Sequence, residues 1–361
     1  MIIVALSGGV DSSVAALLLK QHGYHVEAVF MQNWQDNNQG ECNIAEDLQD
    51  AQAVCDLLKI KLHVINFSHE YWNGVFKYFL DEYAVGHTPN PDVLCNKEIK
   101  FKAFLEHAKT LGAEYMATGH YARVDRTGRL ARLLKGVDDR KDQSYFLHLL
   151  NQTQLNNTLF PLGELTKESV RKISAAAHLP NCHKKDSTGI CFIGERKFRN
   201  FLGEYLLARP GEIVTSEGEI VGHHDGLMFY TIGQRKGIGI GGQKAATEAP
   251  WYVAGKNIDS NLLIVTQNKN DPSLFNDSLI CQRAHWIAGE EPSFPLYCHA
   301  KIRYRHNDEA CCVTRFNHVD DKLLVTFQNH QWAITPGQFV VFYQGDECLG
   351  GAVIEKSCVA S

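Results

Sequence analysis

The stretch SGGVDSS, residues 7–13, is the first in the chain whose residue types and spacing could do chemistry. It follows the apolar run IIVAL and precedes an apolar-periodic segment that begins near Val10. Glycines between a strand and a helix let several backbone N–H groups converge on one point, with the positive end of the helix dipole behind them. The sequence therefore predicts an anion site, to which Ser7, Ser12 and Ser13 add hydroxyl donors.

The loop matches neither of the two common phosphate-binding motifs. A Walker A motif needs a lysine directed at the β- and γ-phosphates, and the dinucleotide motif has the spacing G-x-G-x-x-G. Asp11 would repel a bare phosphate, but it suits a site where Mg²⁺ bridges a carboxylate and a pyrophosphate. Asp11 is therefore the candidate metal ligand, and the alternative is a glycine turn that caps an ordinary helix.

A second candidate segment is GHTPNPDVLCNKEIKF, residues 86–101. A Pro-Asn-Pro turn leads into a predicted helix, and Asp92 lies three residues before Cys95. We expect Cys95 at or near the helix N-terminus, where the dipole lowers the pKa of a thiol and where Lys97 and Lys100 add positive charge. The segment predicts a thiolate beside a carboxylate.

The third candidate segment, NCHKKDSTGICFIGERKF, covers residues 181–198. It is a polar loop that contains Cys191 and ends in a basic stretch. Two interpretations stay open. Cys191 is either a second reactive thiol or a cysteine buried under the loop with Ile190 and Phe192.

The elements that must position these residues begin with strands that alternate with helices. Apolar runs predict strands at 2–6, 25–31, 61–67 and 114–120. Apolar periodicity predicts helices at 10–21, 44–59, 69–84 and 97–110. This alternation is typical of βαβ units and of a doubly wound parallel sheet. A hairpin at 121–136, a helix capped by Thr166 and a helix at 196–207 complete a first domain, residues 1–207.

From about Arg209 the chain changes to short alternating runs separated by Gly, Pro, Asn and Asp. This pattern indicates an all-β region. We predict a small central β domain over residues 208–275 and a second β domain over 276–361. The fold class expected is thus α/β plus all-β.

Composition narrows the class of protein. The chain has 361 residues and a formal net charge of −5, so it lacks the global basic field of many nucleic-acid binders. Basic residues are nevertheless concentrated locally: residues 96–145 carry 11 Lys and Arg against 7 Asp and Glu. Eleven cysteines without a C-x-x-C pair argue against a disulfide framework and a zinc site. We expect no membrane span, no cleavable leader and a cytoplasmic location.

Residues 7–13 resemble the PP-loop of the ATP-pyrophosphatase group, whose members cleave ATP between the α- and β-phosphates and transfer AMP to an oxygen. The segments TPNPDVLCNKEIKF and STGICFIGER closely resemble the bacterial and mitochondrial tRNA-specific 2-thiouridylases. The stretches ATGHYAR, KDQSYFL, GLMFYTIGQRKGIGIGG and TPGQFVVFY follow in that family's order, so the resemblance covers essentially the whole chain.

The resemblance implies a fold and an activity. The first domain would be a PP-loop domain of the adenine nucleotide alpha hydrolase type, and the last a six-stranded β-barrel that contacts tRNA. The implied reaction is ATP-dependent 2-thiolation of the wobble uridine of tRNA, with release of AMP and pyrophosphate. The implied cofactors are ATP and Mg²⁺. The implied partners are tRNA and a persulfide donor, either a relay carrier protein or a cysteine desulfurase.

The resemblance also implies three sets of site residues. Those that would bind ATP are Ala5, Leu6, Ser7, Gly8, Gly9, Val10, Asp11, Ser12, Met31 and Gly119. Those that would be catalytic are Cys95 as nucleophile, Cys191 as persulfide carrier and Asp92 as general acid or base. Those that would contact tRNA are Asn90, Pro91 and Asp92 at the target uridine, and His120, Lys141, Asp142, Gln143, Arg303, Tyr304 and Gln338 elsewhere.

Two routes for the sulfur remain open at this point. Cys95 either attacks the inner sulfur of a Cys191 persulfide and releases sulfide, or it resolves the product after the terminal sulfur has attacked C2. Two other functions also remain open. One is a PP-loop ligase, such as an amidating synthetase, with structural cysteines; the other is a catalytically silent, ATP-responsive RNA-binding module.

Overall fold

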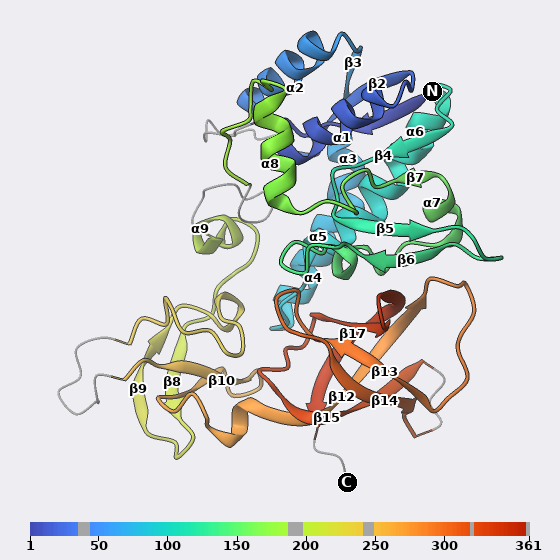
Figure 1. Ribbon diagram of the computed structural model, residues 1–361. Coiled ribbons are helices and arrows are strands. Elements are labelled where there is room, and N and C mark those ends of the chain that lie inside the picture. The colour runs from blue at the N-terminus through green and yellow to red at the C-terminus, as the bar shows by residue number, and fades with distance from the viewer. Residues whose placement is uncertain (35–43, 187–197, 241–248, 318–320, 359–361) are drawn as a thin grey trace.

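The computed structural model describes residues 1–34, 44–186, 198–240, 249–317 and 321–358. The chain forms an α/β region, drawn at the top of Figure 1, and two β regions below it. Between them lie α4 (Lys77–Ala84) and α5 (Pro91–Leu94), which extend from the α/β region toward the β regions. The segment with Asp92 and Cys95 therefore lies where the three regions meet.

The α/β region is built on five parallel strands in the order β3-β2-β1-β4-β7. The strands are β1 (Ile2–Ala5), β2 (Val26–Gln32), β3 (Leu62–Asn66), β4 (Tyr115–Ala117) and β7 (Thr158–Leu159). The predicted doubly wound parallel sheet is confirmed. The fifth strand, β7, was not predicted, because a run of two residues has no readable period.

Helices cover both faces of this sheet. Successive side chains of a strand point to opposite faces, so one strand contributes to two hydrophobic cores. Ile2 and Val4 of β1 belong to one core and Ile3 and Ala5 to the other. The first core is covered by α1 (Val10–Gln21), α2 (Ile44–Leu58) and α8 (Lys167–Ala176). The second is covered by α3 (Ser68–Tyr71), α4, α5 and α6 (Phe104–Thr110), with the π-helical stretches Trp72–Phe76 and Cys95–Ala103 between them.

The two β regions are separate sheets. The central sheet has the order β10-β11-β8-β9 and consists of β8 (Gly211–Thr215), β9 (Ile220–His224), β10 (Tyr252–Asn257) and β11 (Leu262–Thr266). The last region contains β12 (Phe275–Trp286), β13 (Leu296–Lys301), β14 (Glu309–Arg315), β15 (Lys322–Trp332), β16 (Phe339–Gln344) and β17 (Glu347–Cys358). Pairing of β12 with β17 closes these six strands into a barrel, as expected from the resemblance.

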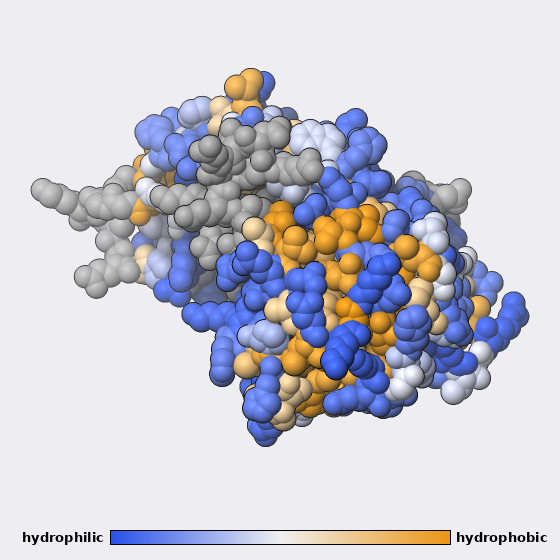
Figure 2. Space-filling model, turned by 90° about the horizontal axis from the view of Figure 1, so that it is seen from above, coloured by the Kyte–Doolittle hydropathy of each residue, from blue (hydrophilic) through white to orange (hydrophobic). Residues whose placement is uncertain are grey.

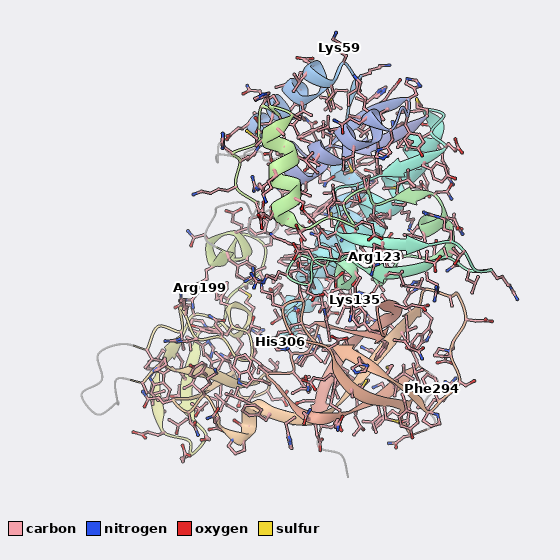
Figure 3. The ribbon with its side chains drawn as sticks, in the orientation of Figure 1. Lys59, Arg123, Lys135, Arg199, Phe294 and His306 are labelled. Atoms are coloured by element: carbon pink, nitrogen blue, oxygen red, sulfur yellow. The ribbon has the colours of Figure 1, made fainter. Side chains whose placement is uncertain are left out.

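The predicted hairpin has an unexpected partner. It forms β5 (Ala122–Asp125) and β6 (Arg132–Lys135), and β6 pairs with β17 of the barrel through Leu133 and Leu134. Arg123 bonds Asp346 at 2.8 Å and Lys135 bonds Asp308 at 2.8 Å across the same boundary, where Figure 3 labels both basic residues. The first domain is therefore tied to the barrel by a shared sheet.

The remaining short helices are α7 (Gln152–Asn156), which begins with a capping box of Asn151 and Gln154, and α9 (Phe198–Gly203). Seen from the side of the α/β region, hydrophobic residues gather over part of the surface among hydrophilic ones (Figure 2). Within the described ranges, no helix is long and apolar enough to span a bilayer.

Candidate active site at the PP-loop and the Asp92 helix

The loop after β1 is a rigid turn at the start of α1. Gly8 has a φ of +75°, and a Cβ there would lie 2.2 Å from the carbonyl oxygen of Asp47, so the position requires glycine. The hydroxyls of Ser12 and Ser13 donate to the carbonyl oxygen of Gly9 at 3.1 and 2.9 Å. Both serines are buried, whereas Ser7 is exposed. Ser7 is therefore the loop hydroxyl that faces solvent, and the other two shape the turn.

The predicted nucleotide-binding residues converge at the carboxyl ends of the strands. Ala5 ends β1, Met31 lies near the end of β2, and the N–H of Leu6 donates to Val29. Gly119 follows β4, and a Cβ at Gly119 would lie 2.6 Å from the backbone nitrogen of Ser12. β1 lies between β2 and β4, the point where doubly wound sheets bind ligands. The structure thus brings these residues together.

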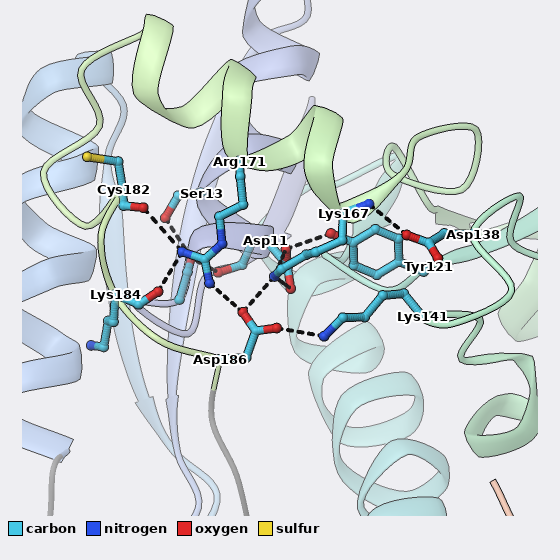
Figure 4. Close-up of polar contacts among 12 residues, drawn as sticks. Asp11, Ser13, Tyr121, Asp138, Lys141, Lys167, Arg171, Cys182, Lys184 and Asp186 are labelled. Carbon is cyan, nitrogen blue, oxygen red and sulfur yellow. Dashed lines mark hydrogen bonds and ion pairs between the residues drawn. The ribbon is translucent and has the colours of Figure 1, made fainter. Parts of the chain in front are cut away.

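Asp11, the candidate metal ligand, is held by a lysine that the sequence analysis did not find. Lys167, the first residue of α8, bonds both carboxylate oxygens of Asp11, at 2.7 and 2.8 Å (Figure 4). The hydroxyl of Tyr121 donates to the same carboxylate at 2.8 Å. A lysine therefore does contact the loop, but it lies 156 positions away from Asp11 in the chain rather than within the motif.

A fit for Mg²⁺ at Asp11 depends on ligands from outside the protein. Among the described residues, no three His, Cys, Asp or Glu side chains are gathered as a metal site. Mg²⁺ at nucleotide sites is commonly held by one or two carboxylates together with phosphate oxygens and water. The single carboxylate of Asp11, beside the loop predicted to bind an anion, is compatible with that arrangement.

Asp186 is the centre of a second polar cluster beside the loop. Its carboxylate bonds Lys141 at 2.6 Å, Lys167 at 2.7 Å and Arg171 at 2.6 Å (Figure 4). Partial burial acts to raise the pKa of Asp186, but the bonds from Lys141 and Lys167 hold that pKa well below its ordinary value. Asp186 is therefore a carboxylate in a strongly positive environment.

Asn181 connects this segment directly to the loop. Its side-chain amide donates to the carbonyl oxygen of Gly8 at 2.8 Å and to the hydroxyl of Ser13 at 2.9 Å. Arg171 holds the following residues through the carbonyl oxygens of Cys182 and Lys184. Cys191, the predicted persulfide carrier, lies outside the described residues.

The Asp92 helix begins at Pro91, six residues before the start predicted at residue 97. Pro91 is its first residue and Asn90 precedes it, so Asp92 is in the first turn and Cys95 in the second. Cys95 is 2% exposed and packs in the core beneath the sheet. The prediction that Cys95 sits at the helix N-terminus is thus shifted by about one turn, and Asp92 occupies the first turn instead.

Asp92 has the properties of an acid or base. Burial raises the pKa of Asp92, and the positive charge of Lys100 partly offsets that effect. A carboxyl group with a raised pKa can hold and release a proton closer to neutral pH. Asp92 is therefore suited to proton transfer.

His120 links the nucleotide loop to this helix. It follows Gly119 directly, and its ring lies 5.6 Å from the ring of Phe101. Desolvation and the charge of Lys100 hold the pKa of His120 well below its ordinary value, so the ring is neutral near pH 7. The positive charge of Lys100 lowers the pKa of both Asp92 and His120.

Residues 86–90, just before Asp92, are held by both β regions. The N–H of Thr88 donates to the carbonyl oxygen of Pro336 at 3.0 Å, and Gln338 donates to the carbonyl oxygen of Thr88 at 2.6 Å. From the central sheet, Lys256 donates to the carbonyl oxygen of Gly86 at 2.9 Å. Burial lowers the pKa of Lys256 to about 8.

Several predicted tRNA contacts have internal partners. Asp142 is 3% exposed and accepts N–H bonds from Gly136 and Ser144. Arg303 donates to the carbonyl oxygens of Ile232 and Ala333 at 2.8 and 2.9 Å, which joins the central region to the barrel.

The same holds for two neighbouring predictions. Gln143 accepts the N–H of Tyr121, and the Tyr304 ring lies 4.5 Å from that of Phe146. Contact of these side chains with tRNA stays a prediction, while Arg303 and Tyr304 make contacts that join one region to another.

Comparison with known proteins places the chain among characterised families. Residues 1–195 match a family model described as a tRNA methyl transferase HUP domain. Residues 199–267 match a tRNA methyl transferase PRC-barrel domain, and residues 276–354 an aminomethyltransferase beta-barrel domain.

Three relatives carry the name tRNA-specific 2-thiouridylase MnmA. The Coxiella burnetii protein is 57% identical over 355 residues, which cover 98% of both chains. The Legionella pneumophila protein is 55% identical over 98% of both chains. The Nitrosococcus oceani protein is 56% identical over 98% of this chain and 96% of its own.

Proposed function

The chain belongs to the tRNA-specific 2-thiouridylase family, and from this premise we propose that it is a tRNA sulfurtransferase which thiolates C2 of the wobble uridine at the expense of ATP. One structural observation supports it most directly. Gly119 packs against Ser12 of the loop, and the ring of the next residue, His120, lies 5.6 Å from that of Phe101, on the helical stretch Cys95–Ala103 that continues directly from α5. An ATP site and an acid–base group are thus joined by adjacent residues.

The first step is activation of the uridine. Oxygen O2 is a poor leaving group, so it attacks the α-phosphorus of ATP and pyrophosphate departs. Asp92 accepts the proton from N3 of the base, which makes O2 nucleophilic. The loop backbone around Gly8 and Gly9, with Ser7 and Lys167, holds the departing pyrophosphate. Mg²⁺ at Asp11 would neutralise part of the phosphate charge.

The second step is sulfur transfer, for which Cys191 carries the persulfide. In one route Cys95 attacks the sulfur bonded to Cys191, sulfide leaves, and the sulfide displaces AMP from C2. In the other the terminal sulfur displaces AMP first, and Cys95 then attacks the Cys191 sulfur to free the thiouridine. Both routes leave a Cys95–Cys191 disulfide that a reductant must cleave, and both need Cα atoms within about 4.4–6.8 Å.

The proposed partners are tRNA and a persulfide donor, either a relay carrier protein or a cysteine desulfurase, and the proposed compartment is the cytoplasm. The domain limits 1–207, 208–275 and 276–361 are part of the same proposal. Local excess of Lys and Arg over residues 96–145 supports a tRNA partner despite the net charge of −5.

An assay with unmodified tRNA, ATP, Mg²⁺ and a persulfide donor tests this function by reading 2-thiouridine and AMP together. We expect both products in equal amounts. Cys95→Ser and Cys191→Ser should abolish 2-thiouridine while adenylation of tRNA persists. An amidating ligase with structural cysteines would instead release AMP without any stimulation by tRNA, and a silent RNA-binding module would bind tRNA without turnover; either result would reject the proposal.

A further inference from the structure

The carboxylate of Asp186, with its single negative charge, is surrounded by three positively charged side chains. Lys141, Lys167 and Arg171 bond its two oxygens at 2.6 to 2.7 Å (Figure 4). Three cationic donors around one anionic group is the arrangement that proteins use for a phosphate, which carries more oxygens and more charge than a carboxylate. The cluster therefore resembles a phosphate site whose present occupant is a side chain.

The cluster is continuous with the nucleotide loop. Lys167 bonds Asp186 and also both oxygens of Asp11, two residues after Gly9. Lys167 and Arg171 are four residues apart on α8, so they lie on the same face of the helix. The backbone N–H of Lys167 donates to Asp138 at 2.8 Å, which fixes the start of that helix. Lys167 and the start of α8 are thus held in place independently of Asp186.

We propose that Lys141, Lys167 and Arg171 form the binding site for the outer phosphates of a nucleoside triphosphate, and that Asp186 occupies this site as an internal competitor until the nucleotide binds. The proposal rests on the use of ATP in the proposed function. It gives this chain a lysine and an arginine for the phosphates that the loop motif itself does not contain.

The charges favour this exchange. Without Asp186 the three cations remain beside two carboxylates, that of Asp11 and that of Asp138 at the start of α8, which leaves an excess of one positive charge. A tethered carboxylate competes at an effective concentration on the order of millimolar, so it weakens binding without preventing it. A polyphosphate with several charges can displace a group with one.

The position of the three cations favours a phosphate of a nucleotide over a phosphate of the tRNA backbone. The Lys167 side chain is only 15% exposed and is bonded to the loop at the carboxyl end of β1. A backbone phosphate of a folded RNA reaches exposed cations more readily than cations enclosed beside a nucleotide loop. Lys141, which is 37% exposed, is the most accessible of the three.

Calorimetric titration of the purified full chain with inorganic tripolyphosphate tests the proposal. Asp186→Asn should bind tripolyphosphate about tenfold more tightly than the parent, because a competitor that fills the site nine-tenths of the time is removed. Arg171→Met should weaken binding. The matched control is Glu168→Gln, which also removes one negative charge, on the helix that carries Lys167 and Arg171, at an exposed position paired with Lys172. Equal or weaker binding by Asp186→Asn, or the same gain in Glu168→Gln, would overturn the proposal.

A second titration with unmodified tRNA identifies the source of the phosphate. If Asp186→Asn tightens tRNA binding and leaves tripolyphosphate binding unchanged, the cluster serves the tRNA backbone and the proposal is wrong. Neither titration measures thiolation, so failure of the proposed function and failure of this site are separate results. A parent protein that makes no 2-thiouridine while Asp186→Asn still gains affinity would refute the function alone.

Discussion

The side chain of Gln338 in the barrel donates a 2.6 Å hydrogen bond to the carbonyl oxygen of Thr88, four residues before Asp92. Close packing supports this contact, because Gly337 has a φ of +86° and a Cβ there would lie 2.9 Å from Cβ of His87. The barrel residue Gln338, 250 residues further along the chain, therefore sets the position of the segment that leads into the proposed acid–base group.

Gly337→Ala should lower the rate of thiolation by a larger factor than it lowers the equilibrium constant for folding. The new methyl group displaces residues 87–88 and moves the start of the Asp92 helix, and a misplacement of 1 Å can cost about 100-fold in rate. The measurement is the single-turnover rate of 2-thiouridine formation. The matched control is Gly345→Ala, which also has a positive φ but has open space around its Cβ. Equal rate losses in both variants would show that backbone strain, not position, is the cause.

Cys55 and Cys95, the buried cysteines among the described residues of the first domain, should behave differently. Cys95→Ser should abolish sulfur transfer and leave adenylation intact, because a hydroxyl is a far weaker nucleophile than a thiolate. Cys55→Ser should thiolate at the normal rate with a lower melting temperature, because Cys55 lies in the opposite core and its burial raises its pKa to about 12. Normal sulfur transfer by Cys95→Ser would contradict the role we assign to it.

The pH dependence of adenylation should report Asp92. As a base it acts in the carboxylate form, so the rate should rise with pH through a midpoint above the ordinary value of 3.8. Lys100→Met removes the charge that lowers the pKa of Asp92 and should move the midpoint to higher pH. Asp92→Asn should abolish both the pH dependence and most of the adenylation rate. Asp81→Asn, at an exposed position on α4, is the control that should retain the parental profile.

His148 should make the fold sensitive to acid. It is fully buried beside Phe339, and desolvation lowers its pKa to about 3. The unfolded chain, with a histidine pKa of about 6.5, then binds the proton more tightly, so the free energy of unfolding falls as pH drops below about 6.5. The His148 contribution should amount to about 1.4 kcal/mol between pH 7.5 and 5.5.

Urea unfolding of His148→Asn measures the His148 contribution as the difference in unfolding free energy between the parent and the variant. The gap in unfolding free energy between the two proteins should narrow by that amount on going from pH 7.5 to 5.5. Between pH 7.5 and 8.5 the gap should stay constant, which serves as the internal control. A gap independent of pH would show that the pKa of His148 is the same in the folded and unfolded states.

Local patterns predicted most of the first domain because each element has a strong signal of its own. The helix predicted at 10–21 is observed as Val10–Gln21, and that capped by Thr166 as Lys167–Ala176. The helix predicted at 97–110 begins instead at Pro91, although proline is favoured at a first helical position and was a usable signal. The turn-like run of Pro-Asn-Pro masked it.

The contacts that complete the site were not predictable in this way. Lys167 meets Asp11 across 156 positions, and Gln338 meets Thr88 across 250. Pairing of the 121–136 hairpin with the barrel also joins segments that are far apart in the sequence. Such contacts arise from packing of whole domains, and no spacing within a short segment encodes them.

The fate of the uridine oxygen tests the central claim most directly. A tRNA carrying ¹⁸O at C2 of the target uridine is incubated with the enzyme, ATP, Mg²⁺ and a persulfide donor, and the products are analysed by mass spectrometry. The account predicts one ¹⁸O in AMP for each 2-thiouridine formed, because the oxygen leaves as part of the displaced AMP. Label in inorganic phosphate, or 2-thiouridine formed with unlabelled AMP, would contradict adenylation of the base.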